Sequence, residues 1–377
     1  MKRDPHQDAV VRPEVTQAGV TGSRYVAAGS DRAIVSPPAA VWRARLVSGA
    51  TPERLSVALD DIVVDLEAPP AVASFVRARY AVGTHSAPSV MSRLLMEHRP
   101  RVLDGVGSRR ILASHGALWC RGFPGLDDLT VGMRPSGPPD FVAYFSRSAM
   151  RRAYKAVVVG ARTHQMLEML FAYVVLYPAL LAGEFRGRYP LHASAVVADG
   201  RVVILLGLPG SGKSTLSAAL QTAGFAVLSD NLVTVGAEGV WSVPEPMKLD
   251  ERSHELVGSD SAGESAATYG RSAHPLLTPP PGPLPVAGVV HLVAGSSTSL
   301  TPSDDLTPER LLDLNRLALE LHAYYYYRSF ARLAFGSSDQ PSEWQVFGDV
   351  LAAAPVSTLV VGRNEVRQAC AAIRSLL

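Results

Sequence analysis

One loop of the sequence, Gly207-Leu-Pro-Gly-Ser-Gly-Lys-Ser214, contains the residues with the clearest chemistry. It matches the pattern GxxxxGK(S/T), in which backbone N–H groups close around phosphate oxygens and the next helix adds its positive N-terminal dipole. In that chemistry Lys213 reaches the β- and γ-phosphates and the Ser214 hydroxyl binds Mg²⁺. We therefore expect ATP and Mg²⁺ as cofactors. The residues expected to contact the nucleotide are Gly207, Leu208, Pro209, Gly210, Ser211, Gly212, Lys213, Ser214 and Thr215.

Three further side chains could complete a site around this loop. Asp230 should end the strand that follows the loop helix, where a carboxylate can bind Mg²⁺ through water or accept a proton from an attacking hydroxyl. A turn-forming Asp230-Asn231 pair is the alternative. His192 is expected on the strand beside the one that enters the loop, as a site residue or as a core histidine. Glu245 is either a third metal ligand, with Ser214 and Asp230, or a surface residue.

The flanking sequence predicts the elements that must position these side chains. Two β-rich runs, 191–198 and 201–206, are separated by Asp199-Gly200, a pair suited to a type I′ turn. An antiparallel hairpin should therefore enter the loop, and a helix over about 213–222 and a strand over 225–229 should follow it. This strand–loop–helix–strand unit is the context that a phosphate-binding loop requires.

Further along the chain, the sequence predicts four more elements. A buried strand is expected at 286–293 and a last strand at 357–361. Thr307 followed by Pro308 is typical of a helix start, and that helix should continue through Leu321. A last helix is expected over 364–377.

The run from Leu191 to Leu220, followed by Gly224 and Ser229-Asp230-Asn231, resembles the catalytic core of HPr kinase-type serine kinases. The histidine-bearing hairpin before the phosphate loop is the distinctive part, and the resemblance is strong over residues 186–250. It implies an α/β fold, namely a kinase domain with a central β-sheet flanked by helices and a smaller mixed α+β domain before it. Two features of the family differ here: its usual second aspartate is replaced by Asn231, and its segment for phosphorolysis is missing.

The resemblance also implies roles for individual residues. His192 would lie at the active site, and Asp230 would be the general base toward a serine-like hydroxyl. Lys213, whose role comes from the phosphate-loop motif, is the third residue of the expected catalytic set. Glu245 corresponds to the family's metal-ligating glutamate. Similar kinases modify ribosomal peptides such as lasso-peptide precursors, or phosphorylate free serine. The expected acceptor is therefore a hydroxyl-bearing peptide, protein or small molecule.

The 377 residues are expected to form more than one domain. We predict a mobile tail at 1–40 and an α+β domain at 41–160 that recognises the acceptor. A connecting apolar helix follows at 161–185. The kinase domain should span 186–377 and contain a mobile insertion at 258–285, which is rich in Ser, Gly, Ala and Pro.

Composition argues against several other classes of function. The 36 Lys and Arg residues against 34 Asp and Glu leave a formal charge of +2, too small for the basic field that nucleic-acid binding normally requires. Cys120 and Cys370 match no zinc pattern, and the N-terminus lacks an apolar signal segment, so we expect a cytoplasmic protein with reduced thiols. The charge-free run 169–183 is shorter than the ~20 residues that cross a bilayer, which favours a buried helix and no membrane partner.

Other interpretations stay open at this point. The chain could be a non-catalytic regulatory ATP-binding module, which Asn231 favours. A GTPase is the weakest alternative, because Met247-Lys-Leu-Asp250 lacks the asparagine of a guanine-reading motif. Tyr324 to Tyr327, with Arg328, are either packed residues or aromatic anchors for a peptide. Assembly into a homo-oligomer is also open.

Overall fold

The computed structural model describes residues 51–377 except for short gaps. The gaps are residues 78–79, 81, 84–87, 96–110, 115, 124–125, 137, 146–161, 244–246, 258–270, 275–281, 337–338, 363 and 377. The expected tail at 1–40 lies outside the described residues, as does most of the expected insertion at 258–285. The described residues form several mixed sheets and helices, so the fold is α/β as predicted.

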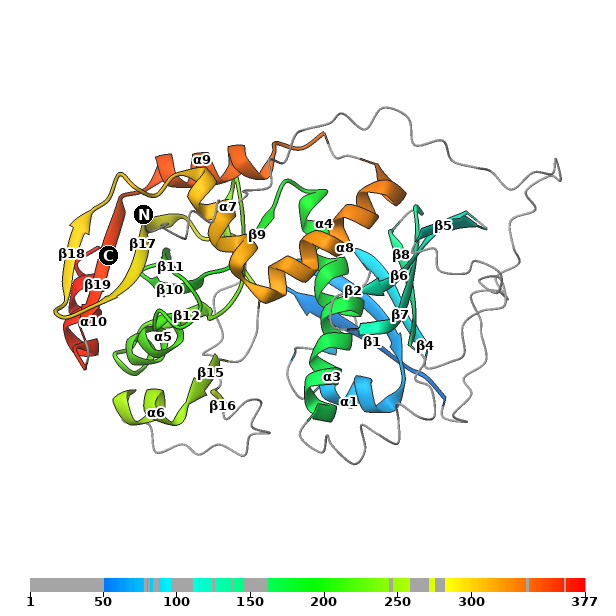
Figure 1. Ribbon diagram of the computed structural model, residues 1–377, viewed down its shortest axis with the longest axis horizontal. Helices are drawn as coiled ribbons and strands as arrows, with labels where there is room; N and C mark the ends of the chain where they lie inside the picture. Colours follow the sequence, from blue (N-terminus) through cyan, green and yellow to red (C-terminus); the bar gives the residue numbers. More distant parts are fainter. Residues whose placement is uncertain are drawn as a thin grey trace, which may run out of the picture. The chain divides into compact units, whose positions relative to one another are not determined.

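The first half of the described chain forms an eight-stranded mixed sheet, with the strand order β3-β1-β2-β4-β8-β7-β6-β5 (Figure 1). The pairs β2–β4 and β4–β8 are parallel. Along β2 every second residue is buried, because alternate side chains of a strand point to opposite faces. The elements are β1 (Glu53–Leu59), β2 (Ile62–Ala68), α1 (Pro70–Arg77), β3 (Val82–Gly83), β4 (Val90–Leu95), β5 (Ile111–Ser114), β6 (Ala117–Phe123), β7 (Leu126–Arg134) and β8 (Asp140–Phe145).

The expected apolar helix consists of three consecutive helical segments, α3 (Arg162–Phe171), the π-helix η2 (Ala172–Leu176) and α4 (Tyr177–Glu184). Pro178 lies in the first turn of α4 and has no N–H, and the wider π turn ends just before it, with the Tyr177 N–H donating to the Ala172 carbonyl. Within the described part of the chain, Leu167–Glu184 is the one helix long and apolar enough to cross a membrane, and 78% of it is buried. The prediction of a buried helix is confirmed.

The second half is built on a six-stranded sheet with the order β12-β10-β11-β17-β19-β18. A small sheet of β14, β13 and β9 and the pair β15–β16 accompany it. The strands are β9 (Tyr189–Leu191), β10 (Ser194–Ala198), β11 (Arg201–Leu206), β12 (Ala226–Ser229), β13 (Val233–Gly236), β14 (Gly239–Ser242), β15 (Met247–Asp250), β16 (Arg271–His274), β17 (Val286–Gly295), β18 (Ser299–Pro302) and β19 (Val356–Gly362). The helices are α5 (Lys213–Thr222), α6 (Glu251–Val257), α7 (Pro308–Leu317), α8 (Leu319–Phe335), α9 (Glu343–Ala353) and α10 (Val366–Arg374).

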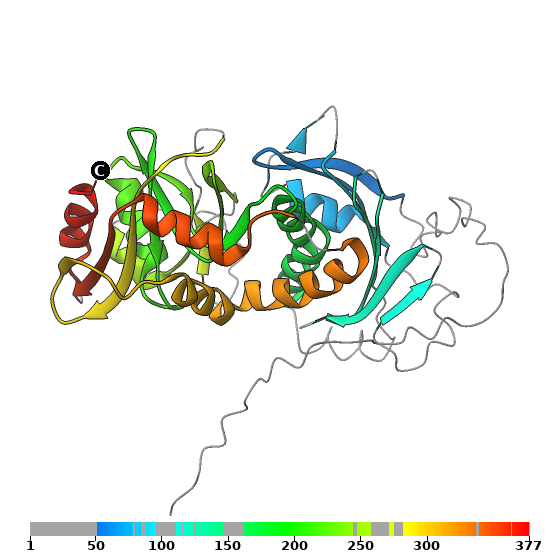
Figure 2. The ribbon, with the colours of Figure 1, turned by 90° about the horizontal axis from the view of Figure 1, so that it is seen from above.

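Helices cover both faces of the six-stranded sheet. Val203 and Leu205 of β11 share a core with α5 and α10, whereas Val202, Ile204 and Leu206 share the opposite core with α7 and α9. Figure 2 looks onto the face where α9 lies over the strands. A strand buried on both faces reads as an unbroken apolar run, which is the sequence pattern of residues 202–206.

Several local predictions are confirmed. Strands β10 and β11 form the expected hairpin, and both turn residues, Asp199 and Gly200, have the positive φ of a type I′ turn. Helix α5 begins and ends where the sequence predicts. The Thr307 side chain caps α7 by accepting from the Arg310 N–H at 3.3 Å. The expected helix does not continue to Leu321 without a break, because Ala318 is extended and separates α7 from α8.

The predicted position of His192 on a hairpin strand is wrong. Strand β9 ends at Leu191, which pairs with Val233 in the small sheet, and β10 begins at Ser194, which pairs with Leu205 in the large sheet. His192 lies in the two-residue break between the two strands. Here its backbone N–H donates to a side chain, the Asn315 carbonyl oxygen, at 2.8 Å.

Candidate functional site

The phosphate-loop motif connects β11 to α5, and its backbone depends on glycine at two positions. Gly212 has a left-handed φ of 92° and is the N-cap of α5. Gly207 has a φ of 156°, and a Cβ there would lie 2.5 Å from the Ser211 hydroxyl oxygen and 3.0 Å from the Leu292 carbonyl oxygen. The loop therefore packs against its own Ser211 and against β17, and a side chain at position 207 would disturb it.

Lys213 folds back over this loop. Its ammonium donates to the carbonyl oxygens of Gly207 at 2.8 Å and Leu208 at 3.3 Å, and the side chain is buried. These contacts hold a positive charge beside the loop and the N-terminus of α5, where an anion would be stabilised. The Ser211 hydroxyl oxygen is buried in the same loop and makes no hydrogen bond.

Asp230, directly after β12, is the carboxylate that meets the loop. Ser214 donates to it, the Ser194 hydroxyl lies 3.1 Å from its Oδ1, and the backbone of Lys248 also hydrogen bonds to it. Burial raises the pKa of Asp230, and the two serine hydroxyls and the charge of Lys213 oppose that rise by stabilising the ionised form. The structure thus places three predicted site residues, Lys213, Ser214 and Asp230, in one group.

Sequence reasoning missed Ser194 as a member of this site. In addition to facing the carboxylate, its hydroxyl donates to the Asp230 backbone carbonyl. Strands β10 and β12 are antiparallel and pair Ala195 with Ser229, which brings Ser194 next to Asp230. The only signal in the sequence is the position of Ser194 at the start of the hairpin strand, and its meaning depends on β12 lying beside β10.

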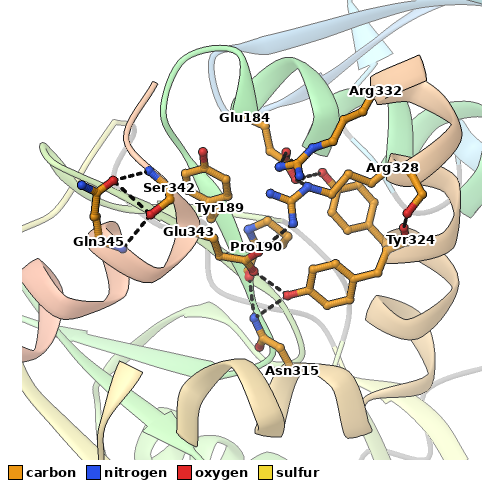
Figure 3. Close-up of polar contacts among 12 residues, drawn as sticks. Glu184, Tyr189, Pro190, Asn315, Tyr324, Arg328, Arg332, Ser342, Glu343 and Gln345 are labelled. Carbon is orange, nitrogen blue, oxygen red and sulfur yellow. Dashed lines mark hydrogen bonds and ion pairs between the residues drawn. The ribbon is translucent and has the colours of Figure 1, made fainter. Parts of the chain in front are cut away.

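His192 is buried two residues before Ser194, and Asn315 fixes its backbone. The Asn315 amide nitrogen donates to the Pro190 carbonyl at 2.9 Å and lies 3.3 Å from the Tyr325 hydroxyl. One fully buried side chain of α7 therefore links Pro190 of β9 to the backbone of His192 in the break. Figure 3 shows Asn315 beside Pro190. Sequence reasoning missed Asn315, whose signal is a polar residue beside Leu314 on the buried face of α7.

The remaining predicted residues have different positions. Thr215 points its hydroxyl at the Ser253 hydroxyl of α6, 2.8 Å away. Leu208 is exposed at the tip of the loop. Glu245 lies outside the described residues. Across the described ranges of 51–377, no group of three or more His, Cys, Asp or Glu residues is close enough to hold a metal ion. The neighbouring oxygens of Ser214 and Asp230 are the donors that a hard cation such as Mg²⁺ prefers.

A buried ion network joins helices α4, α8 and α9 (Figure 3). Arg328 of α8 donates to Glu184 of α4 and to Glu343 of α9, each at 2.7 Å. Tyr324 also donates to Glu184, at 2.5 Å, and Tyr325 donates to Glu343. Because Tyr325 also contacts Asn315, hydrogen bonds run from Glu343 to the backbone of His192.

The tyrosine run divides between packing and polar contacts. Tyr324 and Tyr327 are fully buried, whereas Tyr325 and Tyr326 are partly exposed. The first of the two interpretations, packing, therefore holds for Tyr324 and Tyr327. Burial raises the pKa of Glu184, while Arg328 and the Tyr324 hydroxyl favour its ionised form.

Comparison with known proteins adds no relative. No protein-family model matches the chain, and the search of curated proteins found no match. The resemblance to HPr kinase-type kinases therefore depends on the residues quoted from 186–250.

The network predicts a large effect of one substitution on stability. Arg328→Met leaves Glu184 and Glu343 buried without their shared cation, so we expect the free energy of unfolding to fall by about 3–5 kcal/mol. Arg54→Met is the control, because its ion pair with Glu67 is exposed and should contribute under about 1 kcal/mol. Urea denaturation measures both. Equal losses for the two variants would contradict a central role of Arg328.

Proposed function

We propose that the protein is an ATP- and Mg²⁺-dependent kinase. It transfers the γ-phosphoryl group to a serine-like hydroxyl of a peptide, a protein or a small amino-acid-like acceptor. The observation that carries this proposal is the contact between Ser214 of the phosphate-loop motif and the buried carboxylate of Asp230, with the Lys213 charge beside it. In this proposal the six-stranded sheet and its helices are a P-loop kinase domain of the HPr kinase type, and the protein is cytoplasmic.

The residues present fit a nucleotide and a metal ion. The glycine backbone leaves room for phosphate oxygens, and the buried Ser211 hydroxyl has a hydrogen-bonding capacity that the protein leaves unused. Lys213 would exchange its two carbonyl contacts for oxygens of the nucleotide. Mg²⁺, bound by Ser214 with Asp230 nearby, would neutralise phosphate charge. The protein would then catalyse the reaction mainly by positioning the reactants and stabilising their charge, because phosphoryl transfer requires little covalent chemistry from the protein.

Asp230 is the proposed general base. The acceptor oxygen forms a bond to the γ-phosphorus, the bond from that phosphorus to the bridging oxygen of ADP breaks, and the hydroxyl proton moves to Asp230. Burial raises the pKa of Asp230, which makes its carboxylate a better proton acceptor than an exposed aspartate. His192 is proposed as an active-site residue, and Asn315 as the residue that positions its backbone.

A non-catalytic regulatory ATP-binding module is the second candidate. It is favoured by Asn231, which replaces the second aspartate of the family that the sequence resembles. Such a module would bind ATP through the same loop and form no phosphorylated product.

The first test is a transfer assay. Purified protein is incubated with Mg²⁺-ATP, candidate acceptors and cell extract, and phosphorylation is detected by mass spectrometry as a gain of ~80 Da. We expect phosphorylated product with the wild type. The transfer rate should fall about 100-fold or more in Asp230→Asn, because the base is removed, and in Lys213→Ala, because the phosphate contact is removed. Asp199→Asn, in an exposed turn, is the matched control and should keep full activity.

Two outcomes would change the assignment. Full activity in Asp230→Asn would remove Asp230 as the base. ATP binding without any phosphorylated product would favour the regulatory module.

The loop geometry predicts the effect of a small change on nucleotide affinity. Gly207→Ala places a methyl group against Ser211 and β17, so we expect ATP binding to weaken about tenfold, as when one good phosphate contact is lost. Gly224→Ala is the control, since Gly224 also has a positive φ but has nothing near its Cβ position. Isothermal titration calorimetry compares the two. The prediction fails if both variants bind ATP equally well.

The Ser194 contact predicts a change in pH dependence. Its hydroxyl stabilises the ionised form of Asp230 and lowers the pKa of that group. Without it the pKa rises, so a higher pH is needed to deprotonate the base. In Ser194→Ala the acidic limb of the kcat/KM profile should therefore move to higher pH. Ser375→Ala, at an exposed position, should leave the profile unchanged. An unmoved limb in Ser194→Ala would contradict the assignment.

A further inference from the structure

Helices α7, α8 and α9 line an open groove of about 590 Å³. This volume is in the range of ligand pockets. No residue of the phosphate-loop motif lines the groove, so it is distinct from the proposed nucleotide site. Most of its lining residues carry basic side chains or aromatic rings.

Among the lining residues, basic side chains outnumber acidic ones. Arg316 and Arg332 line the groove with side chains that are 67% and 54% exposed, and the exposed His322 lies between them in sequence. Glu343 is the one acidic residue among the described lining residues, and it already pairs with Arg328 at 2.7 Å. The ion pairs of Arg316 with Asp313 and of Arg332 with Glu184 are 3.5 and 3.6 Å long, lengths at which partly exposed pairs are weak. Arg316 and Arg332 are therefore the groups that an anionic occupant would contact.

The aromatic rings point to a peptide. Tyr325, Tyr326 and Trp344 line the groove, and Trp344 is 49% exposed although it is a large apolar residue. Its indole N–H donates to Glu309 at 2.8 Å, which fixes the orientation of the ring. Tyrosine, tryptophan and arginine are the residues that anchor most protein-binding surfaces.

We propose that this groove binds an acidic peptide segment, and that the segment belongs to the acceptor. The second part rests on the kinase function proposed above. One wall of the groove is connected to the proposed active site. Tyr325 lines the groove and contacts Asn315, and Asn315 accepts a hydrogen bond from the backbone N–H of His192. A peptide in the groove would therefore lie beside the hydrogen bonds that fix the site.

Binding is tested on the full chain by fluorescence anisotropy. The probe is a labelled synthetic peptide that alternates Glu and Leu around a central Tyr and a Ser, and the same peptide with Lys in place of Glu is the comparison. We expect the acidic peptide alone to bind, and its affinity to fall with added salt. Arg316→Glu and Trp344→Ala should each weaken binding about tenfold. Arg367→Glu, an exposed arginine on α10, is the matched control and should bind as the wild type does.

The outcomes distinguish a failure of the groove proposal from a failure of the kinase proposal. Equal binding of the Lys peptide, unchanged binding in both groove variants, or a single-stranded RNA that displaces the peptide more tightly would each overturn the groove as an acidic-peptide site. ATP affinity, measured for every variant, should stay at the wild-type value. If the peptide binds but no acceptor is phosphorylated, the groove stands and the kinase function fails. If an acceptor is phosphorylated with the same KM by Arg316→Glu and by the wild type, the groove is not its docking site.

Discussion

The contact of Arg328 with Glu184 and Glu343 is the constraint on which the arrangement around the site depends. Removing three charges from water is expensive, and the cost is offset only when the carboxylates and the guanidinium keep one geometry. That geometry ties the consecutive helices α8 and α9 to α4, which is distant from them in sequence. Through Tyr325 and Asn315 the same polar chain reaches the break between β9 and β10. The helix packing and the backbone at His192 are thus parts of one hydrogen-bonded system.

The strand order of the six-stranded sheet determines which side chains meet at the candidate site. The phosphate-loop motif leaves β11 and Asp230 follows β12, yet these strands are not neighbours, because β10 lies between them. The side chains from β10 therefore meet those from both sides, and Ser194 contacts the carboxylate that also accepts from Ser214. A hydroxyl on the middle strand becomes part of the carboxylate's environment and changes its affinity for protons.

The sequence predicts best those features that are determined by residues adjacent in the chain. Asp199-Gly200 suits a turn with two positive φ angles, Thr307 caps the helix that starts after it, and the glycines of the loop precede α5. The missed features join distant segments: Ser194 meets Asp230 36 residues later, and His192 meets Asn315 123 residues later. Periodicity and local propensity carry no information on these contacts, because they arise only when separate elements pack. The break at His192 was missed for the same reason.

The π-helical segment between α3 and α4 has a consequence for how this chain can vary. A π turn holds one residue more than an α turn, so residues 172–176 act as a single-residue insertion within a helix that otherwise continues. Loss of one residue there would let the segment return to an α-helix while the parts on either side keep nearly their present rotation, because the wide turn is what accommodates the extra residue. Phe171, which stacks on Tyr80, and Tyr177, which packs on Tyr324, would then both keep their partners. Loss of a residue within α3 or α4 would instead rotate the residues before it by about 100°. In this helix the damage done by a deletion therefore depends on where it falls.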